Sequence, residues 1–98
     1  MLVDLPISEI ASKFRSGEIS PVNVIEECYA HIAKYESDMH SFITLVDKDA
    51  AIAKAQKIAK GFASHPSALA GIPYVMKDAY ITRGIRTTAA SKILDTFI

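Results

Sequence analysis

One long amphipathic helix with a clearly marked start constrains the fold of this chain more than any other feature. In ISPVNVIEE, Ser20 is a favoured N-cap residue and Pro21 is preset for the first helical position. Ile19 and Val24 have the spacing of a hydrophobic staple. Apolar residues then recur at three- and four-residue steps, at Ile25, Cys28, Ile32, Tyr35 and Met39. This spacing predicts a helix with one apolar face. The side chains expected to face water are Glu26, Glu27, His31 and Lys34.

A shorter helix is predicted before it. Ser8 can cap a helix that runs to about Arg15, and Gly17 stands where a glycine commonly ends a helix. Its expected apolar face consists of Ile10, Ala11 and Phe14.

A third helix is predicted over DKDAAIAKAQKIAKGF, which begins after Asp47 and ends near Gly61. Its expected buried side consists of Ala51, Ala55, Ile58, Ala59 and Phe62. Most of its lysines fall on the opposite side, which favours a solvated face over a nucleic-acid patch.

Strands are expected on either side of the third helix. SFITLV at 41–46 is rich in β-branched and aromatic residues. Leu69 to Met76 resembles a turn into a buried strand, with Pro73 near its start, where a missing N–H is tolerated. From these patterns we expect burial of Ile25, Cys28, Ile32, Phe42, Leu45, Ile58 and Val75.

The remaining C-terminal residues are more polar. YITRGIRTT at 80–88 predicts a hairpin or an active-site loop that turns at Gly84. Ser91 can cap a last helix over SKILDTF.

Composition narrows the class of protein. The chain has 98 residues, half of them hydrophobic and 22% charged, which indicates at most one globular domain. The 11 basic and 11 acidic residues give no net charge, whereas tight DNA or RNA binding needs a clustered basic excess. The single cysteine, the absence of a basic signal-peptide start and the lack of a membrane-length apolar stretch favour a cytoplasmic protein without membrane contact.

The common catalytic and metal-binding motifs are missing. The three histidines, His31, His40 and His65, have neither zinc-site spacing nor a neighbouring metalloprotease motif, so surface positions are favoured. Cys28 lies on the apolar stripe and is expected to be a small core residue. The isolated glycines form neither a phosphate-binding loop nor a nucleophile elbow, and no cofactor or metal is indicated.

Lys77 raises the question of catalysis because it follows the apolar run GIPYVM. One interpretation is a lysine whose stem follows apolar surface and whose ammonium pairs with Asp78. The residues alone favour this interpretation. The other is a lysine base, because burial penalises the ammonium form of a lysine and can leave a neutral amine.

The segment LAGIPYVMKDAYITRGIRTTAASKIL resembles the opening of the amidase signature family. The L-x-G-I-P…K-D block carries the family resemblance, and GIRTTAASKIL is most similar to the branch of glutamyl-tRNA(Gln)/aspartyl-tRNA(Asn) amidotransferase A subunits. ISEIASKFRSGEISPVNVIEECYAHIAKYE is similar to the family's opening helices. The resemblance therefore covers nearly the whole chain.

The resemblance implies an α/β/α fold with a mixed sheet, of which this chain would hold the N-terminal helices and first strands. Residues 1–66 would be a mainly helical part with one strand, and residues 67–98 the start of the catalytic core. Lys77 would match the lysine of a Ser–cis-Ser–Lys triad. That lysine takes a proton, through the cis-serine, from the serine that attacks the amide carbonyl.

Two departures from the family's pattern matter. Ala79 stands where the family often has Asn, so this position offers the lysine no polar side chain. The family's two serines come from a Gly- and Ser-rich segment downstream of the lysine, and these residues contain no such segment. The isolated chain is therefore expected to be inactive.

Three interpretations remain open. In the first, the chain belongs to an amidotransferase A subunit that hydrolyses glutamine and works with the B and C subunits on misacylated tRNA, with ATP used by one of those partners. In the second, it belongs to a general amidase acting on small amides. In the third, it is a truncated, non-catalytic remnant or interaction module. The apolar ending at Ile98 favours a truncation, and the codons that follow would separate the first interpretation from the third.

Overall fold

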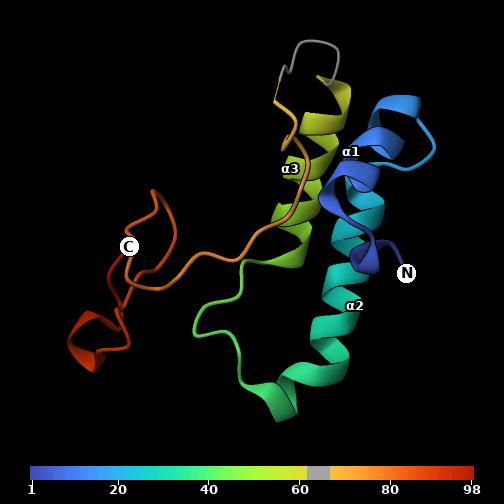
Figure 1. Ribbon diagram of the computed structural model, residues 1–98. Coiled ribbons are helices and arrows are strands. Elements are labelled where there is room, and N and C mark those ends of the chain that lie inside the picture. The colour runs from blue at the N-terminus through green and yellow to red at the C-terminus, as the bar shows by residue number, and fades with distance from the viewer. Residues whose placement is uncertain (62–66) are drawn as a thin grey trace.

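The computed structural model describes residues 1–61 and 67–98, and its regular elements are helices (Figure 1). In chain order these are the 3-10 helix η1 (Leu2–Asp4), α1 (Ile7–Ser16), α2 (Pro21–Met39), α3 (Lys48–Lys60) and the 3-10 helix η3 (Lys92–Leu94). Helix α2 packs against α3 and η1. The chain after residue 67 runs back along α3, and the C-terminal segment then folds away from the helices (Figure 1).

The start of α2 confirms the predicted cap. The Ser20 hydroxyl accepts a 3.0 Å hydrogen bond from the Val22 N–H, and Pro21 is the first helical residue. The Asn23 side chain accepts a 2.8 Å bond from the Ser20 N–H, which completes a reciprocal capping box. At α3, the predicted cap Asp47 accepts a 3.1 Å bond from the Ala50 N–H.

The start of α1 differs from the prediction. The residue before the helix is Pro6, whose carbonyl accepts bonds from Glu9 and Ile10 at 3.0 and 3.1 Å. Helical hydrogen bonding therefore begins before Ser8, which lies inside the first turn and caps nothing. The predicted end is confirmed, because Gly17 has a φ of +77°, a left-handed conformation that glycine adopts without strain.

The core is small and lies where α1, α2 and η1 meet. Ile10, Phe14 and Val24 form its buried cluster, and the predicted apolar face of α1 is confirmed. Partly buried side chains complete it, namely Leu2, Val3, Leu5, Ile19, Cys28 and Ile72. Ile72 brings the start of the C-terminal segment onto the helices.

The burial expected of seven apolar residues in the helices and predicted strands is wrong at two of them and incomplete at the other five. Leu45 is 45% exposed and Val75 is 72% exposed. The others expected to be buried are half-buried: Ile25, Cys28, Ile32, Phe42 and Ile58. On α3 only Ala55 is fully buried, and Phe62 lies outside the described residues. A residue is fully buried only where other elements surround it, and the main neighbours of α2 among the described elements are α3 and the short η1.

The two predicted strands are absent from residues 1–61 and 67–98. Residues 41–46 form an irregular connection. In the run from Leu69 to Met76 the predicted turn is present, closed by a 3.1 Å bond from the Ile72 N–H to the Leu69 carbonyl, but residues 72–76 form no strand. High β propensity produces a strand only where a partner takes up the backbone hydrogen bonds. The hairpin around Gly84 is reduced to one antiparallel bridge between Thr82 and Ile85.

The last predicted helix is correct in its cap and too long in its extent. The Ser91 hydroxyl accepts a 3.3 Å bond from the Ile93 N–H, but the helix that follows is the three-residue η3.

The described chain is less compact than a typical globular domain of its length. Its radius of gyration is 14.8 Å, whereas about 13 Å is typical of a 100-residue domain. Large apolar side chains are exposed in the C-terminal segment, notably Tyr74, Val75, Met76, Tyr80 and Ile81. Among the described helices, none combines the length and apolar character needed to cross a bilayer.

Candidate active-site segment

Lys77 lies at the end of the extended run that starts on the helices. The Lys77 carbonyl accepts a 3.1 Å hydrogen bond from the Tyr80 N–H, which closes a four-residue turn over 77–80. The Lys77 side chain is exposed, and Tyr74 and Val75 before it are each 72% exposed. The burial that a lysine base requires is therefore not provided by the described residues of this chain.

Asp78 does not pair with Lys77 and binds the loop at 88–90 instead. Its Oδ1 accepts a 3.0 Å bond from the Thr88 N–H. Its Oδ2 accepts bonds from the Thr88 hydroxyl and, at 3.4 Å, from the Ala90 N–H. The Asp78 carbonyl accepts a 2.8 Å bond from the Ala89 N–H. We call these four bonds the Asp78 clamp.

The clamp lowers the pKa of the Asp78 carboxyl below its ordinary value. The bond from the Thr88 hydroxyl is the largest cause, followed by the bond from the Thr88 N–H. Desolvation opposes these bonds and ranks third, and the Ala90 N–H and the positive charge of Arg86 add smaller contributions that lower the pKa further. Each of these groups favours the carboxylate over the protonated acid, so Asp78 is held charged at neutral pH.

The partner loop of the clamp is tightly constrained. Thr87 and Thr88 are the buried polar residues of the described chain, with 5% and 2% of their surface exposed. The Thr87 N–H donates a 3.0 Å bond to the Phe97 carbonyl. Ala89 and Ala90 have φ values of +49° and +59°, in the left-handed region that residues with a Cβ rarely adopt.

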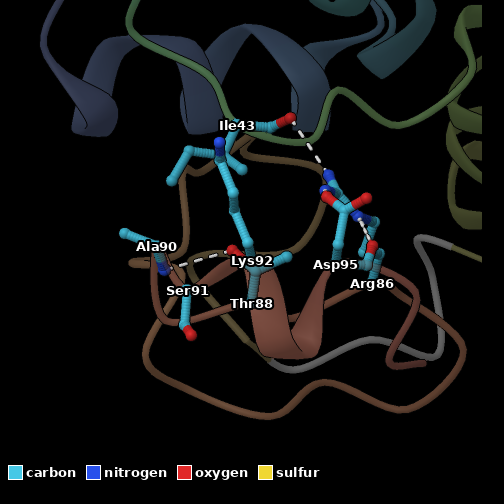
Figure 2. A pocket seen from close by; sticks show the side chains of 7 residues that line it. All are labelled: Ile43, Arg86, Thr88, Ala90, Ser91, Lys92 and Asp95. Carbon is cyan, nitrogen blue, oxygen red and sulfur yellow. Dashed lines mark hydrogen bonds and ion pairs between the residues drawn. The ribbon is translucent and has the colours of Figure 1, made fainter.

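A small hollow lies beside this loop. It encloses about 230 Å³ and is lined by Ile43, Arg86, Thr88, Ala90, Ser91, Lys92 and Asp95. Figure 2 shows Arg86 and Asp95 close together on one side and Ala90 and Ser91 on the other. Arg86 also donates to the Thr44 hydroxyl at 3.0 Å and to the Ile43 carbonyl at 3.4 Å. The hollow is thus a junction between the α2–α3 connection and the C-terminal segment, and Lys77 is not among its lining residues.

The remaining candidate reactive side chains show no sign of catalytic or metal-binding roles in the described residues. Burial, helped by the negative charge of Glu27, raises the pKa of the half-buried Cys28 thiol, which disfavours the reactive thiolate. Glu27 was expected to face water, but its carboxylate accepts bonds from the Leu2 and Val3 N–H groups at 3.1 and 3.2 Å. His65 lies outside the described residues. No group of three or more His, Cys, Asp or Glu residues in the described chain is placed to hold a metal ion.

Sequence reasoning singled out Lys77 as a candidate but missed the contact between Asp78 and Thr88. The sequence suggests Asp78 only as an ion-pair partner of its neighbour and assigns no role to Thr88. The two residues are ten positions apart in irregular backbone, where no periodicity relates them. The one available signal was composition, because adjacent threonines inside a loop can donate hydroxyl bonds to a nearby carboxylate.

Comparison with known proteins places these features in a family. Residues 23–98 match the model of the Amidase family. The chain is 39% identical over 98 residues to the A subunit of the Glutamyl-tRNA(Gln) amidotransferase of Syntrophus aciditrophicus. It is 38% identical over 96 residues to the protein of the same name from Listeria monocytogenes serotype 4a, and 42% identical over 97 residues to that from Bacillus thuringiensis.

These alignments cover 98 or 99% of this chain and 20% of each relative. The chain thus spans about a fifth of the length of the curated relatives it matches. No solved structure matches it. Because the family model extends over most of the sequence, including Lys77 and the whole Asp78 clamp, the chain belongs to the Amidase family.

Proposed function

We propose that this chain is the N-terminal piece of the A subunit of a glutamine-dependent tRNA amidotransferase. The parent enzyme would hydrolyse glutamine and supply the ammonia that converts Glu-tRNA(Gln) or Asp-tRNA(Asn) to the amide. The observation that carries the proposal is the alignment of almost the whole chain with relatives named as A subunits of Glutamyl-tRNA(Gln) amidotransferase. The parent fold would be an α/β/α domain with a mixed sheet, in which 67–98 begins the catalytic core.

Lys77 is the proton acceptor in this proposal. A lysine works as a base only where its ammonium form is disfavoured, which requires dry surroundings. The exposed apolar side chains on both sides of Lys77, among them Tyr74, Val75 and Ile81, are suited to be covered by another part of the parent protein. Once covered, they would exclude water from the amine. The exposed apolar side chains around Lys77 therefore support a role as base in the parent protein, where they would be covered, and not in the isolated segment.

The reaction follows the family's Ser–cis-Ser–Lys scheme. The nucleophilic serine passes its proton through the cis-serine to the neutral Lys77 amine and attacks the side-chain amide carbon of glutamine. The C–N bond then breaks, ammonia leaves with a proton returned along the same relay, and water hydrolyses the acyl-serine to glutamate. Both serines lie elsewhere in the parent protein, so this chain supplies the base and the backbone that holds it.

The proposed partners are the B and C subunits and, through them, misacylated tRNA. ATP would be used by one of these partners, and this chain would bind no cofactor. The experiment that tests the function measures ammonia release by the purified parent protein, with and without the partner subunits, on glutamine and on small amides such as acetamide.

Glutamine turnover that depends on the partner subunits supports the proposal. Efficient hydrolysis of small amides by the parent protein alone would instead identify a general amidase. No turnover of any amide, with the partners present, would leave the non-catalytic interaction module as the better description.

A further inference from the structure

The Asp78 clamp is built on the residue next to the proposed base. The turn over 77–80 is closed by the Tyr80 N–H on the Lys77 carbonyl at 3.1 Å. Asp78 is the second residue of that turn, and both its carboxylate and its carbonyl are bonded to 88–90. The backbone of Lys77 is thus one residue away from four hydrogen bonds to a separate loop.

The loop that Asp78 binds is strained in a way that needs these bonds. Consecutive left-handed alanines persist only where their surroundings hold them. The Ala89 N–H is held by the Asp78 carbonyl at 2.8 Å. The Ala90 N–H is shared between Asp78 Oδ2 at 3.4 Å and the Thr88 hydroxyl at 3.1 Å. Strain of this kind marks a place where the chain is held in one conformation.

We propose that Asp78 is a positioning residue for Lys77. By clamping the 77–80 turn to the buried Thr88, it fixes the backbone from which the Lys77 side chain projects into the active site of the parent enzyme. This inference rests on the proposed role of Lys77 as the base.

The chemistry of the clamp requires a carboxylate. Asp78 Oδ1 and Oδ2 both accept bonds, and the bonded groups at 88–90 are N–H and O–H donors. An asparagine amide offers one accepting oxygen and one donating nitrogen, so it can satisfy one side of the clamp and opposes a backbone N–H on the other, that of Ala90 or, with the amide flipped, that of Thr88. Asp78→Asn is therefore an isosteric change that breaks the clamp.

Misplacement of the base has a large kinetic cost. A long lysine stem has many rotamers, and a shift of about 1 Å in a reacting group can cost about a hundredfold in rate. We expect Asp78→Asn and Thr88→Val to lower kcat for glutamine by roughly tenfold to a hundredfold in the parent enzyme, with KM nearly unchanged. Thr88→Ser keeps both donors to Asp78 and should retain most of the wild-type kcat.

The experiment measures kcat, KM and melting temperature for the parent enzyme assembled with its partner subunits. Matched controls are Asp38→Asn on α2 and Thr96→Val near the C-terminus, which change exposed residues outside the clamp. Amide hydrogen exchange of peptides that cover 88–90 reports the clamp directly, and exchange there should rise in Asp78→Asn and Thr88→Val.

The possible outcomes separate this inference from the proposed function. Loss of kcat in Asp78→Asn and Thr88→Val, with rescue in Thr88→Ser, supports the positioning role. A wild-type kcat in Asp78→Asn despite faster exchange at 88–90 would overturn it and leave the function of Lys77 standing. If Asp78→Asn does not fold, equal kcat values for Thr88→Val and Thr88→Ser would overturn it. Wild-type glutamine turnover by Lys77→Met would remove the proposed role of Lys77 as the base, and the positioning role with it, whereas absence of partner-dependent turnover in the wild-type enzyme would remove the proposed function.

Discussion

The hydroxyl of Thr44 accepts a 3.0 Å hydrogen bond from the guanidinium of Arg86, 42 residues further along the chain. The same guanidinium pairs with Asp95 and reaches the Ile43 carbonyl. One side chain thus joins the α2–α3 connection to the C-terminal segment. Since the described residues contain no strand that could join these parts, Arg86 is a main link between the helices and the Lys77 segment.

We expect Arg86→Lys to loosen this link, because an ammonium cannot reproduce the planar fork that serves four acceptor atoms. The bonds are partly exposed, so the loss of global stability should stay below about 1 kcal/mol. Hydrogen exchange over 85–97 should nevertheless rise, while exchange in α1 and α2 stays unchanged. Arg83→Lys, at an exposed neighbouring position, is the matched control. Equal exchange in both variants would show that Arg86 is not the link.

The cap of α2 gives a second prediction. Ser20→Ala removes the acceptor of the Val22 N–H and half of the capping box, and should destabilise the chain by about 1 kcal/mol. Ser8→Ala should have an effect within about 0.5 kcal/mol, because Ser8 lies inside α1 and caps nothing. Urea unfolding followed by circular dichroism measures both. Equal losses would mean that Ser8 caps α1 in solution after all.

These two serines show how far sequence reasoning reaches. A cap is a local pattern, and the caps at Ser20, Asp47 and Ser91 were all predicted. The cap predicted at Ser8 is wrong because α1 begins earlier, after Pro6, whose carbonyl accepts the first helical bonds. Residue propensity alone does not decide between two nearby helix starts.

The strands could not be predicted correctly from local residues. SFITLV and the run after Leu69 have strand composition, but a strand also requires a partner edge, and pairing is a non-local property. The burial expected of Leu45 and Val75 failed for the same reason. The candidate site could be predicted only in part from the sequence. A motif singles out Lys77 as a candidate, whereas the contact between Asp78 and Thr88 depends on how two irregular segments meet.

The lowered pKa of Asp78 predicts a pH dependence of the clamp. A carboxyl whose pKa is depressed by folding contributes stability above its unfolded value, near 3.8, and loses it as the pH falls through the lower folded value. The amides of 88–90 should therefore be protected at neutral pH and lose protection in strong acid, below about pH 4.

Nuclear magnetic resonance of the Ala89 and Ala90 amides across this range measures the effect. In Asp78→Asn the loss of amide protection below about pH 4 should vanish, while in Asp38→Asn it should persist. A loss of protection that survives in Asp78→Asn would assign it to another carboxyl group.

The isolated 98-residue chain should release no ammonia from glutamine or from simple amides. Lys77 is exposed in it, and a lysine base without its two serines has no nucleophile to activate. Loss of a nucleophile typically costs several orders of magnitude in rate. The check is an ammonia assay on the purified chain, with the parent enzyme as the positive control. Turnover that a serine-directed reagent abolishes would contradict this prediction.

Substitution of Lys77 in the parent enzyme tests the proposed base. Lys77→Met keeps the length and the apolar stem but cannot take a proton, so amide hydrolysis should be lost at little cost in stability. Lys77→Arg should fail as well, because a guanidinium stays protonated at any working pH and is broader than an amine. Lys57→Met, on the exposed lysine face of α3, should leave the rate unchanged.

The two substitutions of Lys77 also separate catalysis from a surface role. A lysine that only follows apolar surface to water would accept arginine with near-normal activity. Ammonia release and a melting curve for each variant decide between these roles. A near-wild-type rate for Lys77→Arg, with an unchanged melting temperature, would remove Lys77 from the mechanism. The 77–80 turn would then be a structural corner of the fold, held by Asp78 for stability alone.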